Sequence, residues 1–309
     1  MAYNSENSPV DCSLEIDTSV VAGKTAIVTG GASGLGEAYV RALAAAKVSV
    51  IIADVDPTRG NKLSSELANT KYVQCDVRKW KDQVHVFEEA VKFSPTGRIH
   101  YVVANAGVAR KDEIFSFEKD GPTEPDLTTI DINLQGTLYT TKLATHYFIK
   151  QNGTTQSKDK EDTGLVLIGS GAAFLDCPRG PSYQATKWAS RGVMHSLRRT
   201  AHFYGSRVNM ISPWYVQTNI LKSEAFDHVR RSGVDLAEAE DGGRCLLRIL
   251  SDPSINGRSL FLSPKKWAPA GFIDLNIDDY AGNERLQEIQ MDQIKSAPIE
   301  LGLFGASDY

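Results

Sequence analysis

The sequence predicts an α/β fold in which one doubly wound parallel sheet of about seven strands carries helices on both faces and is followed by a C-terminal extension. From residue 24 onward, short β-rich apolar runs alternate with longer amphipathic segments, which is the pattern of repeated βαβ units. Several of these runs are apolar almost throughout, as expected of strands that helices cover on both sides. A glycine-rich turn at residues 29–36 joins the first run to an amphipathic segment.

The order of the predicted elements follows from this alternation. The predicted strands are the short apolar runs at residues 25–29, 48–53, 72–74, 99–104, 165–169, 207–211 and 259–262. The predicted helices are the segments at residues 34–46, 57–68, 79–93, 125–150, 181–204 and 235–251. The second helix has a well-defined start, because Asp56 can cap it and Pro57 fits its first position.

The sequence indicates a single domain with two flanking segments. We expect a flexible N-terminal arm over residues 1–20, the domain over residues 21–263 and a C-terminal extension over residues 264–309. Residues 151–163 are polar and charged and fit a solvated excursion between a helix and a strand. The extension has a short helical pattern around residues 283–295. We expect it to pack on another surface because it carries Trp267, Phe272, Leu301 and Phe304.

Composition and charge exclude several classes of function. Lys and Arg number 34 against 38 Asp and Glu, and the net charge of −4 disfavours nucleic acid as the main partner. The 4 Cys lack C-x-x-C spacing and the 6 His lack ligand spacing, so we expect no disulfide framework, no metal and a cytoplasmic location. Neither a membrane span of roughly 18 apolar residues nor the order of a secretory signal is present, so we expect a soluble chain.

The glycine-rich turn is a candidate phosphate-binding loop. Its sequence, Thr29-Gly30-Gly31-Ala32-Ser33-Gly34-Leu35-Gly36, follows a predicted strand and runs into a predicted helix. Glycine allows a sharp turn and a close approach of backbone to a pyrophosphate, and the N–H groups at the helix start then face the anion. The alternative is a tight turn with a glycine needed for packing. The strand before and the helix after favour the phosphate loop.

Asp54, at the end of the second predicted strand, indicates the type of dinucleotide. A carboxylate at this place accepts hydrogen bonds from the ribose hydroxyls of NAD and repels the 2′-phosphate of NADP. The sequence therefore favours NAD. Arg59 lies near enough in sequence to leave NADP open, and Asp54 could instead serve only to end the strand or cap the next helix.

Motifs spread over residues 24–263 resemble those of the short-chain dehydrogenase/reductase family, whose members have a Rossmann-type fold and bind NAD or NADP. The family's T-G-x-x-x-G-x-G motif matches residues 29–36. Its N-A-G motif matches residues 105–107, although Ala104 stands where the family often has a second Asn. The resemblance places the following residues at the cofactor: Thr29, Gly30, Ser33, Gly34, Leu35, Gly36, Asp54, Asp76, Val77, Asn105, Ala106, Gly107, Tyr183, Lys187, Pro213, Val216 and Thr218.

The same resemblance implies a catalytic set of Asn133, Ser170, Tyr183 and Lys187. Hydride transfer from an alcohol also requires a proton to leave its oxygen, and tyrosine, with a pKa near 10, is a poor base at neutral pH. Lys187 lies one helical turn after Tyr183, so we expect its charge, together with that of the oxidised nicotinamide, to lower that pKa. Ser170 can hold the substrate oxygen, and in the family Asn133 holds a water that links the lysine to solvent.

The sequence departs from the family pattern after the sixth predicted strand, where Pro213 is followed by Trp214 instead of glycine. This variant resembles a fungal branch similar to hydroxyaverantin dehydrogenases and to 15-hydroxyprostaglandin dehydrogenase-like proteins. Residues that would flank a substrate pocket are apolar or aromatic, and each could equally be core: Phe174, Leu175, Trp214, Tyr215, Ile220 and Leu221. Cys177 either lines this pocket or is a small buried thiol.

The function expected from these features is an NAD(H)-dependent oxidoreductase that interconverts a secondary alcohol and a ketone on a lipophilic, polyketide-like molecule. One alternative is a dinucleotide-binding enzyme that catalyses a non-redox cyclisation or isomerisation, which the intact catalytic set disfavours. Another is a non-catalytic dinucleotide-binding module. The resemblance also implies a homodimer or homotetramer formed through the long helices near residues 125–150 and 181–204.

Overall fold

A single sheet with helices on both faces forms the body of the protein in the computed structural model, which describes residues 9–155, 160–220 and 223–296. The strands lie in the spatial order β3-β2-β1-β4-β5-β6-β7-β8. Their bounds are β1 (Thr25–Thr29), β2 (Ser49–Asp54), β3 (Thr70–Gln74), β4 (Tyr101–Ala104), β5 (Thr163–Ile168), β6 (Ser206–Pro213), β7 (Ser259–Leu262) and β8 (Phe272–Asp274). This arrangement confirms the α/β fold expected from the sequence.

The sheet differs from the predicted one at its edge. Strands β1 to β7 pair in parallel, whereas β8 lies antiparallel to β7, with Leu262 opposite Phe272. The expected sheet of about seven parallel strands is thus one strand short, because β8 belongs to the extension and spans only 3 residues. So short a run gives no periodic signal in the sequence.

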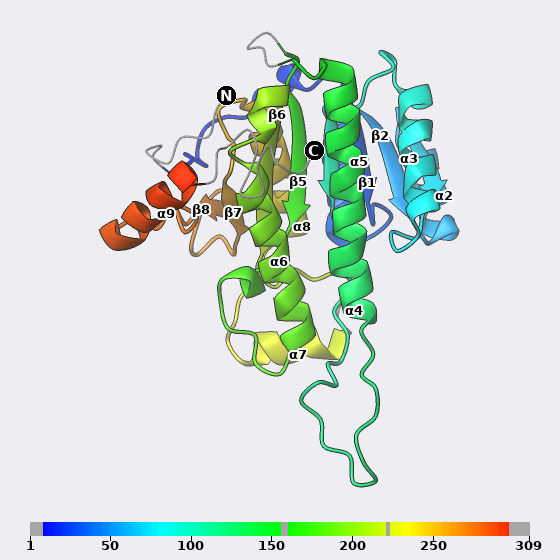
Figure 1. Ribbon diagram of the computed structural model, residues 1–309. Coiled ribbons are helices and arrows are strands. Elements are labelled where there is room, and N and C mark those ends of the chain that lie inside the picture. The colour runs from blue at the N-terminus through cyan, green and yellow to red at the C-terminus, as the bar shows by residue number, and fades with distance from the viewer. Residues whose placement is uncertain (1–8, 156–159, 221–222, 297–309) are drawn as a thin grey trace.

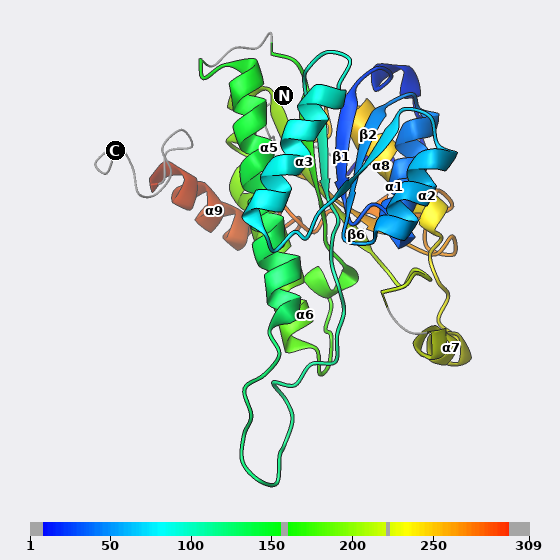
Figure 2. The same cartoon turned by 90° about the vertical axis from the view of Figure 1, so that its right-hand side faces the viewer.

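Helices cover both faces of the sheet, as the view in Figure 2 shows, with α1 and α2 on one side and α3 and α5 on the other. The α-helices are α1 (Gly34–Ala45), α2 (Pro57–Glu66), α3 (Trp80–Phe93), α4 (Thr128–Ile130), α5 (Gly136–Asn152), α6 (Pro181–Leu197), α7 (Ser223–Arg231), α8 (Ala239–Ser251) and α9 (Glu284–Ser296). Shorter helical turns are η1 (Thr18–Val20), the π-helical η2 (Asp131–Gln135), η3 (Gly171–Ala173) and η4 (Ala201–Tyr204). None of the helices in these described ranges is long and apolar enough to cross a membrane.

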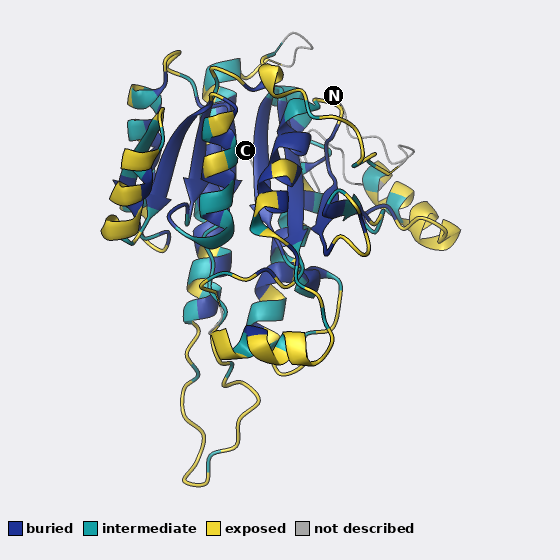
Figure 3. Cartoon of the chain, turned by 180° about the vertical axis from the view of Figure 1, so that it is seen from behind, coloured by how far each residue is buried: buried dark blue, intermediate teal, exposed yellow. Residues whose placement is uncertain are grey.

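Alternation along β1 divides the core into two layers. Ala26 and Val28 belong to a cluster with α1 and α8, and Ile27 belongs to the opposite cluster with α3 and α5. All three side chains are fully buried. Strands that are buried on both faces read as continuous apolar runs, which is why these strands could be identified in the sequence. Figure 3 shows the sheet as the buried centre of the molecule.

The predicted helices are present with altered bounds. The segment expected at 125–150 is divided into α4, the π-helical turn η2 and α5, and the segment expected at 181–204 ends as a helix at Leu197 and continues as η4. Helix α7 was not predicted, because its 9 residues are mostly charged and bury only Phe226. Helix α9 agrees with the helical pattern around residues 283–295.

A long loop between β4 and α4 projects from the end of the sheet at which the parallel strands terminate (Figure 1). It exposes Ile114, Phe115 and Phe117, the last by 93%. The loop is tied to the first turn of α6, because Asp112 Oδ2 accepts a hydrogen bond of 2.6 Å from the backbone N–H of Ser182. Asp112 thereby satisfies a backbone donor that the start of a helix leaves without an intrahelical partner.

The described part of the predicted N-terminal arm lies against the domain. Val10 N donates to Asp274 Oδ2 at 3.0 Å, and Arg248 Nε donates to the carbonyl oxygen of Asp11 at 3.2 Å. Cys12 and Ile16 pack against the core cluster that includes α1 and α8. Residues 9–20 therefore differ from the flexible arm expected there, and residues 1–8 lie outside the described residues.

The segment after β8 is joined to α6 by a buried ionic cluster. Asp278, with a side chain 1% exposed, accepts hydrogen bonds of 2.9 Å from Arg191 Nε and His195 Nε2. One turn further along α6, Arg198 pairs with Asp279 at 3.2 Å. Burial raises the pKa of Asp278, but the bond with His195 and the charge of Arg191 outweigh it and hold that pKa at about 2. The helix that carries Tyr183 is thus fixed by residues of the extension.

We predict that Asp278→Asn lowers the free energy of unfolding by about 2 kcal/mol at pH 7. The folded pKa lies below the unfolded one near 3.9, so the contribution is complete above that value and is lost as pH falls toward 2. The difference between wild type and variant, measured by urea unfolding, should stay constant from pH 7 to 5 and shrink at pH 3. Asp120→Asn, at an exposed loop position, is the control. A difference that grows on acidification would contradict the assignment.

Candidate active site

The turn from β1 into α1 is too tight for larger residues at two of its glycines. A Cβ atom on Gly36 would lie 1.9 Å from the carbonyl oxygen of Gly30, and one on Gly30 would lie 2.8 Å from Cα of Ala106. Gly30 also has a positive φ of 62°. The backbone therefore folds back on itself at the start of α1, where N–H groups point away from the helix and can meet a pyrophosphate.

The N-A-G segment after β4 is fixed against this turn. Thr29 Oγ1 accepts hydrogen bonds from the N–H groups of Asn105 at 3.0 Å and Ala106 at 3.1 Å. In return, Asn105 Nδ2 donates to the carbonyl oxygens of Thr29 at 2.8 Å and Gly30 at 3.0 Å. These reciprocal hydrogen bonds join the loops that follow β1 and β4. Gly107 follows directly, and a Cβ atom on this residue would lie 3.3 Å from Asn133 Oδ1.

Asp54 at the end of β2 braces the loop from the other side. Its Oδ2 accepts from Ala32 N and its Oδ1 accepts from Asp56 N, each at 3.0 Å. Each oxygen has a second lone pair, which leaves the carboxylate able to accept a hydrogen bond from a ribose hydroxyl. The Asp54 carboxylate therefore lies next to the glycine-rich turn, where the sequence predicted it.

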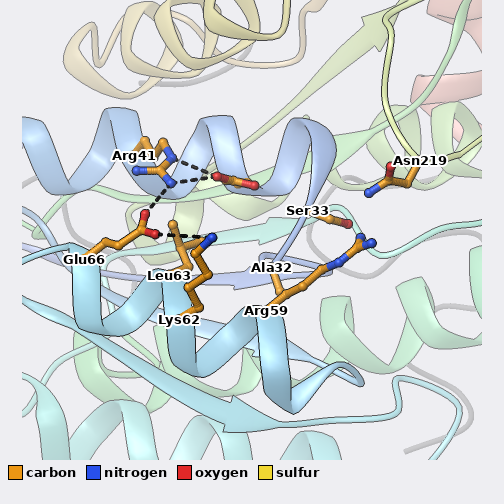
Figure 4. A pocket seen from close by; sticks show the side chains of 9 residues that line it. Ala32, Ser33, Arg41, Arg59, Lys62, Leu63, Glu66 and Asn219 are labelled. Carbon is orange, nitrogen blue, oxygen red and sulfur yellow. Dashed lines mark hydrogen bonds and ion pairs between the residues drawn. The ribbon is translucent and has the colours of Figure 1, made fainter.

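A cavity of about 270 Å³ lies beside Asp54, between α1 and α2. Arg59 extends from α2 toward Ser33, whereas Arg41 is held by Glu37 and Glu66 (Figure 4). The residues that line the cavity are Ala32, Ser33, Glu37, Arg41, Arg59, Lys62, Leu63, Glu66 and Asn219. Ala32 and Ser33 of the glycine-rich turn line this cavity, so its cations, Arg41, Arg59 and Lys62, lie beside that turn.

The remaining cofactor candidates divide by what their side chains contact. Asp76 binds Arg78 Nη2 at 2.7 Å, and Val77 packs on the start of α5 at Gly136. Leu35 contacts α8 at Gly242, so its side chain serves packing and only its backbone faces the loop. Thr218 lies against Gly34, where a Cβ on the glycine would come within 3.0 Å of it.

After β6, Pro213 is the last residue to pair with β7, and Val216 forms an isolated bridge with Ala237. These contacts bring the segment at residues 213–218 back over the phosphate loop, since Thr218 contacts Gly34. Trp214 continues the pairing of β6 with β7, because its backbone N–H donates to the carbonyl oxygen of Leu262 at 2.9 Å. The ring at this position therefore leaves the course of the backbone after β6 intact.

Ser170, Tyr183 and Lys187 come together where β5 ends and α6 begins. Ser170 follows β5 and caps η3, with Oγ accepting from Ala172 N at 3.2 Å. The Ser170 hydroxyl lies near enough to Tyr183 to lower the pKa of its phenol. Lys187 Nζ lies 5.6 Å from the centre of the Tyr183 ring and donates to the carbonyl oxygen of Ile168 at 2.9 Å. The three polar groups thus share one buried corner of the molecule.

The two ionisable groups of this corner have shifted pKa values. Burial raises the pKa of Tyr183 in the protein without cofactor, and the nearby Ser170 hydroxyl only partly offsets this rise. Lys187 does not lower this pKa in the protein alone; its own pKa falls to about 8 because its amine is fully buried. Tyr183 is therefore a phenol at neutral pH, a form that can donate a proton.

Asn133 lies in the π-helical turn η2 that precedes α5, next to the N-A-G segment. Its Oδ1 accepts from Val108 N at 2.8 Å, and its Nδ2 donates to Val108 O at 2.9 Å and to Thr186 Oγ1 at 3.4 Å. Such π-helical turns are frequent at functional sites. Asn133 therefore joins the β4 loop to α6, one residue before Lys187.

The pocket candidates gather around Trp214. Phe174 packs edge-on against Phe261 at 5.5 Å, and Tyr215 packs edge-on against Trp214 at 4.9 Å. Leu175, Tyr215 and Ile220 are exposed by 42%, 41% and 38%, so these three are not core. Leu221 lies outside the described residues. Cys177 is partly buried, and burial raises the pKa of its thiol.

Three residues beside this site were not expected there from the sequence. Phe261 of β7 and Trp267 of the extension both contact Trp214. Asp112 caps the helix that carries Tyr183. Trp267 could be recognised only as an aromatic residue in a tail expected to pack on another surface, because no local pattern indicates a contact 53 residues away in sequence.

The residues present fit a nicotinamide dinucleotide and give no sign of a metal. The glycine turn has the close backbone approach that a pyrophosphate needs, with Asp54 beside it and Lys187 buried further along. Within the described residues, no group of His, Cys, Asp or Glu is arranged to hold a metal ion.

Comparisons with known proteins identify the family of the chain. A sequence model of the family described as short chain dehydrogenase matches residues 24–228. The chain is 29% identical over 298 residues to 5'-hydroxyaverantin dehydrogenase of Dothistroma septosporum, covering 89% of this chain and 94% of that protein. It is 31% identical over 301 residues to 5'-hydroxyaverantin dehydrogenase of Emericella nidulans, covering 91% and 96%.

A solved structure shares the fold. It is the 3-ketoacyl-(acyl-carrier-protein) reductase of Brucella melitensis complexed with NADH, with a TM-score of 0.68 and 23% identity, covering 78% of this chain and 97% of that one. The similarity to fungal hydroxyaverantin dehydrogenases expected from the sequence is confirmed. Together with the matching motifs, these findings show that the chain belongs to the short-chain dehydrogenase/reductase family, whose members are NAD(P)-dependent oxidoreductases acting on CH–OH groups.

Proposed function

We propose that the protein interconverts a secondary alcohol and a ketone on a lipophilic, polyketide-like molecule, with NAD(H) as cofactor and Tyr183 as general acid and base. The observation that carries the proposal is the corner where Tyr183 lies beside Ser170 and the buried amine of Lys187, whose Nζ is 5.6 Å from the centre of the Tyr183 ring. Exposed apolar side chains near that corner, Leu175 and Tyr215, support a lipophilic substrate.

The residues of this corner have complementary tasks. NAD(H) held on the glycine-rich turn beside Asp54 would supply the transfer of a hydride to or from the reacting carbon. In ketone reduction, Ser170 and Tyr183 donate hydrogen bonds to the carbonyl oxygen, and Tyr183 transfers its proton as negative charge develops there. Its raised pKa keeps that proton available at neutral pH. In the oxidation direction Tyr183 first gives up its own proton to the path through Lys187. The resulting phenolate, which the positive charges of Lys187 and of bound NAD⁺ would favour, then accepts the proton of the alcohol.

Lys187 and Asn133 pass the proton between Tyr183 and solvent. With a pKa of about 8, the Lys187 amine is close enough to neutral pH to give up and regain a proton. Asn133 lies close to the lysine, since its Nδ2 donates a hydrogen bond to Oγ1 of Thr186, the residue before Lys187. We assign Asn133 the role of holding a water between Lys187 and solvent, as the family resemblance implies.

The same proposal covers the choice of cofactor. Asp54 supports NAD, because its carboxylate lies beside the phosphate loop and can bind ribose hydroxyls. Arg59, in the cavity next to it, is the residue that would favour NADP. Asp54 is nearer to the loop, since it bonds Ala32 directly, and we therefore assign NAD as the preferred cofactor.

Assembly and location belong to the proposal as well. Helices α5 and α6 lie side by side and expose Leu138 by 45% and Trp188 by 48%, which supports a homodimer or homotetramer through these helices. The scattered cysteines, of which Cys75 and Cys245 are buried thiols, support a cytoplasmic location.

We predict that Tyr183→Phe lowers kcat for both directions by about 10² to 10⁴-fold, because only the proton-transfer group is removed. The dissociation constant of the dinucleotide, measured by calorimetry, should stay within severalfold of the wild-type value. Tyr139→Phe, on the outer part of α5, should leave kcat unchanged. Turnover at the wild-type rate in Tyr183→Phe would overturn the proposed function.

We predict that the wild type has a higher kcat/KM with NAD than with NADP and that Asp54→Asn lowers this ratio by roughly tenfold or more, since a negative charge facing the 2′-phosphate is removed. Adding Arg59→Ala to Asp54→Asn should weaken the use of NADP again. The measurement is initial rates with both dinucleotides, with Asp120→Asn as the control. Equal use of both cofactors by the wild type would remove Asp54 from this role.

A further inference from the structure

Five aromatic side chains form one contiguous cluster beside the catalytic corner. They come from the η3 turn, the segment after β6, β7 and the C-terminal extension, and they are Phe174, Trp214, Tyr215, Phe261 and Trp267. Trp214 is the centre: its ring lies edge-on to Tyr215 at 4.9 Å, to Trp267 at 5.4 Å and to Phe261 at 6.1 Å.

The cluster lies directly against the residue that follows Ser170. A Cβ on Gly171 would be 3.5 Å from Leu175 Cδ1, 3.6 Å from Trp214 Cε3 and 3.7 Å from Phe261 Cε2, so both rings lie beside this residue together with Leu175. Tyr215 is close enough to Tyr183 to contribute to the rise of its pKa. A substrate held by Ser170 and Tyr183 therefore has aromatic rings of the cluster close by.

The cluster has an inner part and an outer part. Phe261 is 6% exposed and belongs to the core, whereas Tyr215 and Trp267 are 41% and 49% exposed. The ring of Trp267 lies over that of Phe261 at an interplanar angle of 27°. Core packing alone does not account for a tryptophan that is half exposed next to a catalytic centre.

Polar contacts fix Trp267 in this place. Lys266 forms an ion pair of 2.9 Å with Asp235, and the carbonyl oxygen of Asp235 accepts a hydrogen bond of 3.2 Å from Trp214 Nε1. The Lys266 amine also lies 5.0 Å from the centre of the Trp267 ring. The two tryptophans are thus held by the same short segment, which reduces the conformational entropy lost when a ligand binds to them.

Resting on the proposed function, we infer that Trp214 and Trp267 bind a flat aromatic ring system that carries the reacting alcohol or ketone, and that Trp267 is a specificity-determining residue. Aromatic rings attract one another in stacked and edge-on arrangements beyond the effect of the buried area. A saturated skeleton of the same size gains the area but not this attraction. The extension thereby contributes directly to the choice of substrate, while the chemical step remains that of Ser170 and Tyr183.

The test compares two ketones that share a carbon skeleton, 2-acetylnaphthalene and its saturated counterpart 2-acetyldecalin, with whichever reduced dinucleotide supports turnover. Trp267→Leu should lower the ratio of kcat/KM for the aromatic over the saturated ketone by roughly threefold to tenfold relative to wild type, mainly through KM. Comparing the ratio between proteins cancels the different intrinsic reactivities of the two ketones. Trp267→Phe should retain most of the wild-type ratio.

Trp80→Leu is the matched control, since Trp80 is also a half-exposed tryptophan but packs on Tyr139, away from the cluster. An unchanged ratio in Trp267→Leu, or an equal fall in Trp80→Leu, would overturn the inference. If the wild type turns over neither ketone, the proposed function fails for these substrates, and calorimetric binding of 2-acetylnaphthalene to the dinucleotide complex then decides. Binding that weakens only in the Trp267 variants supports the inference; absent or unaltered binding contradicts it.

Discussion

The hydrogen bond from Lys187 Nζ to the carbonyl oxygen of Ile168 joins the first turns of α6 to the end of β5, and the active corner depends on it. A buried amine is costly unless it is paired, and this bond is the partner that Lys187 has in the protein alone. Ser170 follows β5 two residues later, and Tyr183 lies one turn before Lys187 on α6. This contact thereby holds the first turns of α6 beside the strand end that Ser170 follows.

Residues outside the predicted domain hold the C-terminal part of α6. Arg191 and His195 reach Asp278, which lies beyond β8 in the extension. The same extension places Trp267 against Trp214. It therefore acts twice on the site, through the helix that carries Tyr183 and through the aromatic surface beside it. Its role is accordingly larger than that of a tail packed on a finished domain.

The parts of the structure that could be predicted are those with a local signal. Most of the strands β1 to β7 were recognisable because their apolar runs are buried on both sides, although the edge strand β3 buries only Val73. The glycine turn was recognisable from its spacing and its context. By contrast, β8 has 3 residues, and the contact of Asp278 with Arg191 spans 87 positions, so no local pattern shows either. Burial raises the pKa of Tyr183 in the protein without cofactor, an effect that sequence does not disclose.

The central claim is that Ser170 and Tyr183 hold the reacting oxygen while the dinucleotide lies on the glycine turn. A crystal structure of the complex with NAD⁺ and a secondary alcohol tests it most directly. The account predicts the alcohol oxygen within about 2.6–3.2 Å of both hydroxyl groups. An alcohol bound elsewhere, or a Tyr183 hydroxyl turned away from it or covered by the ring of Trp214, would contradict the account.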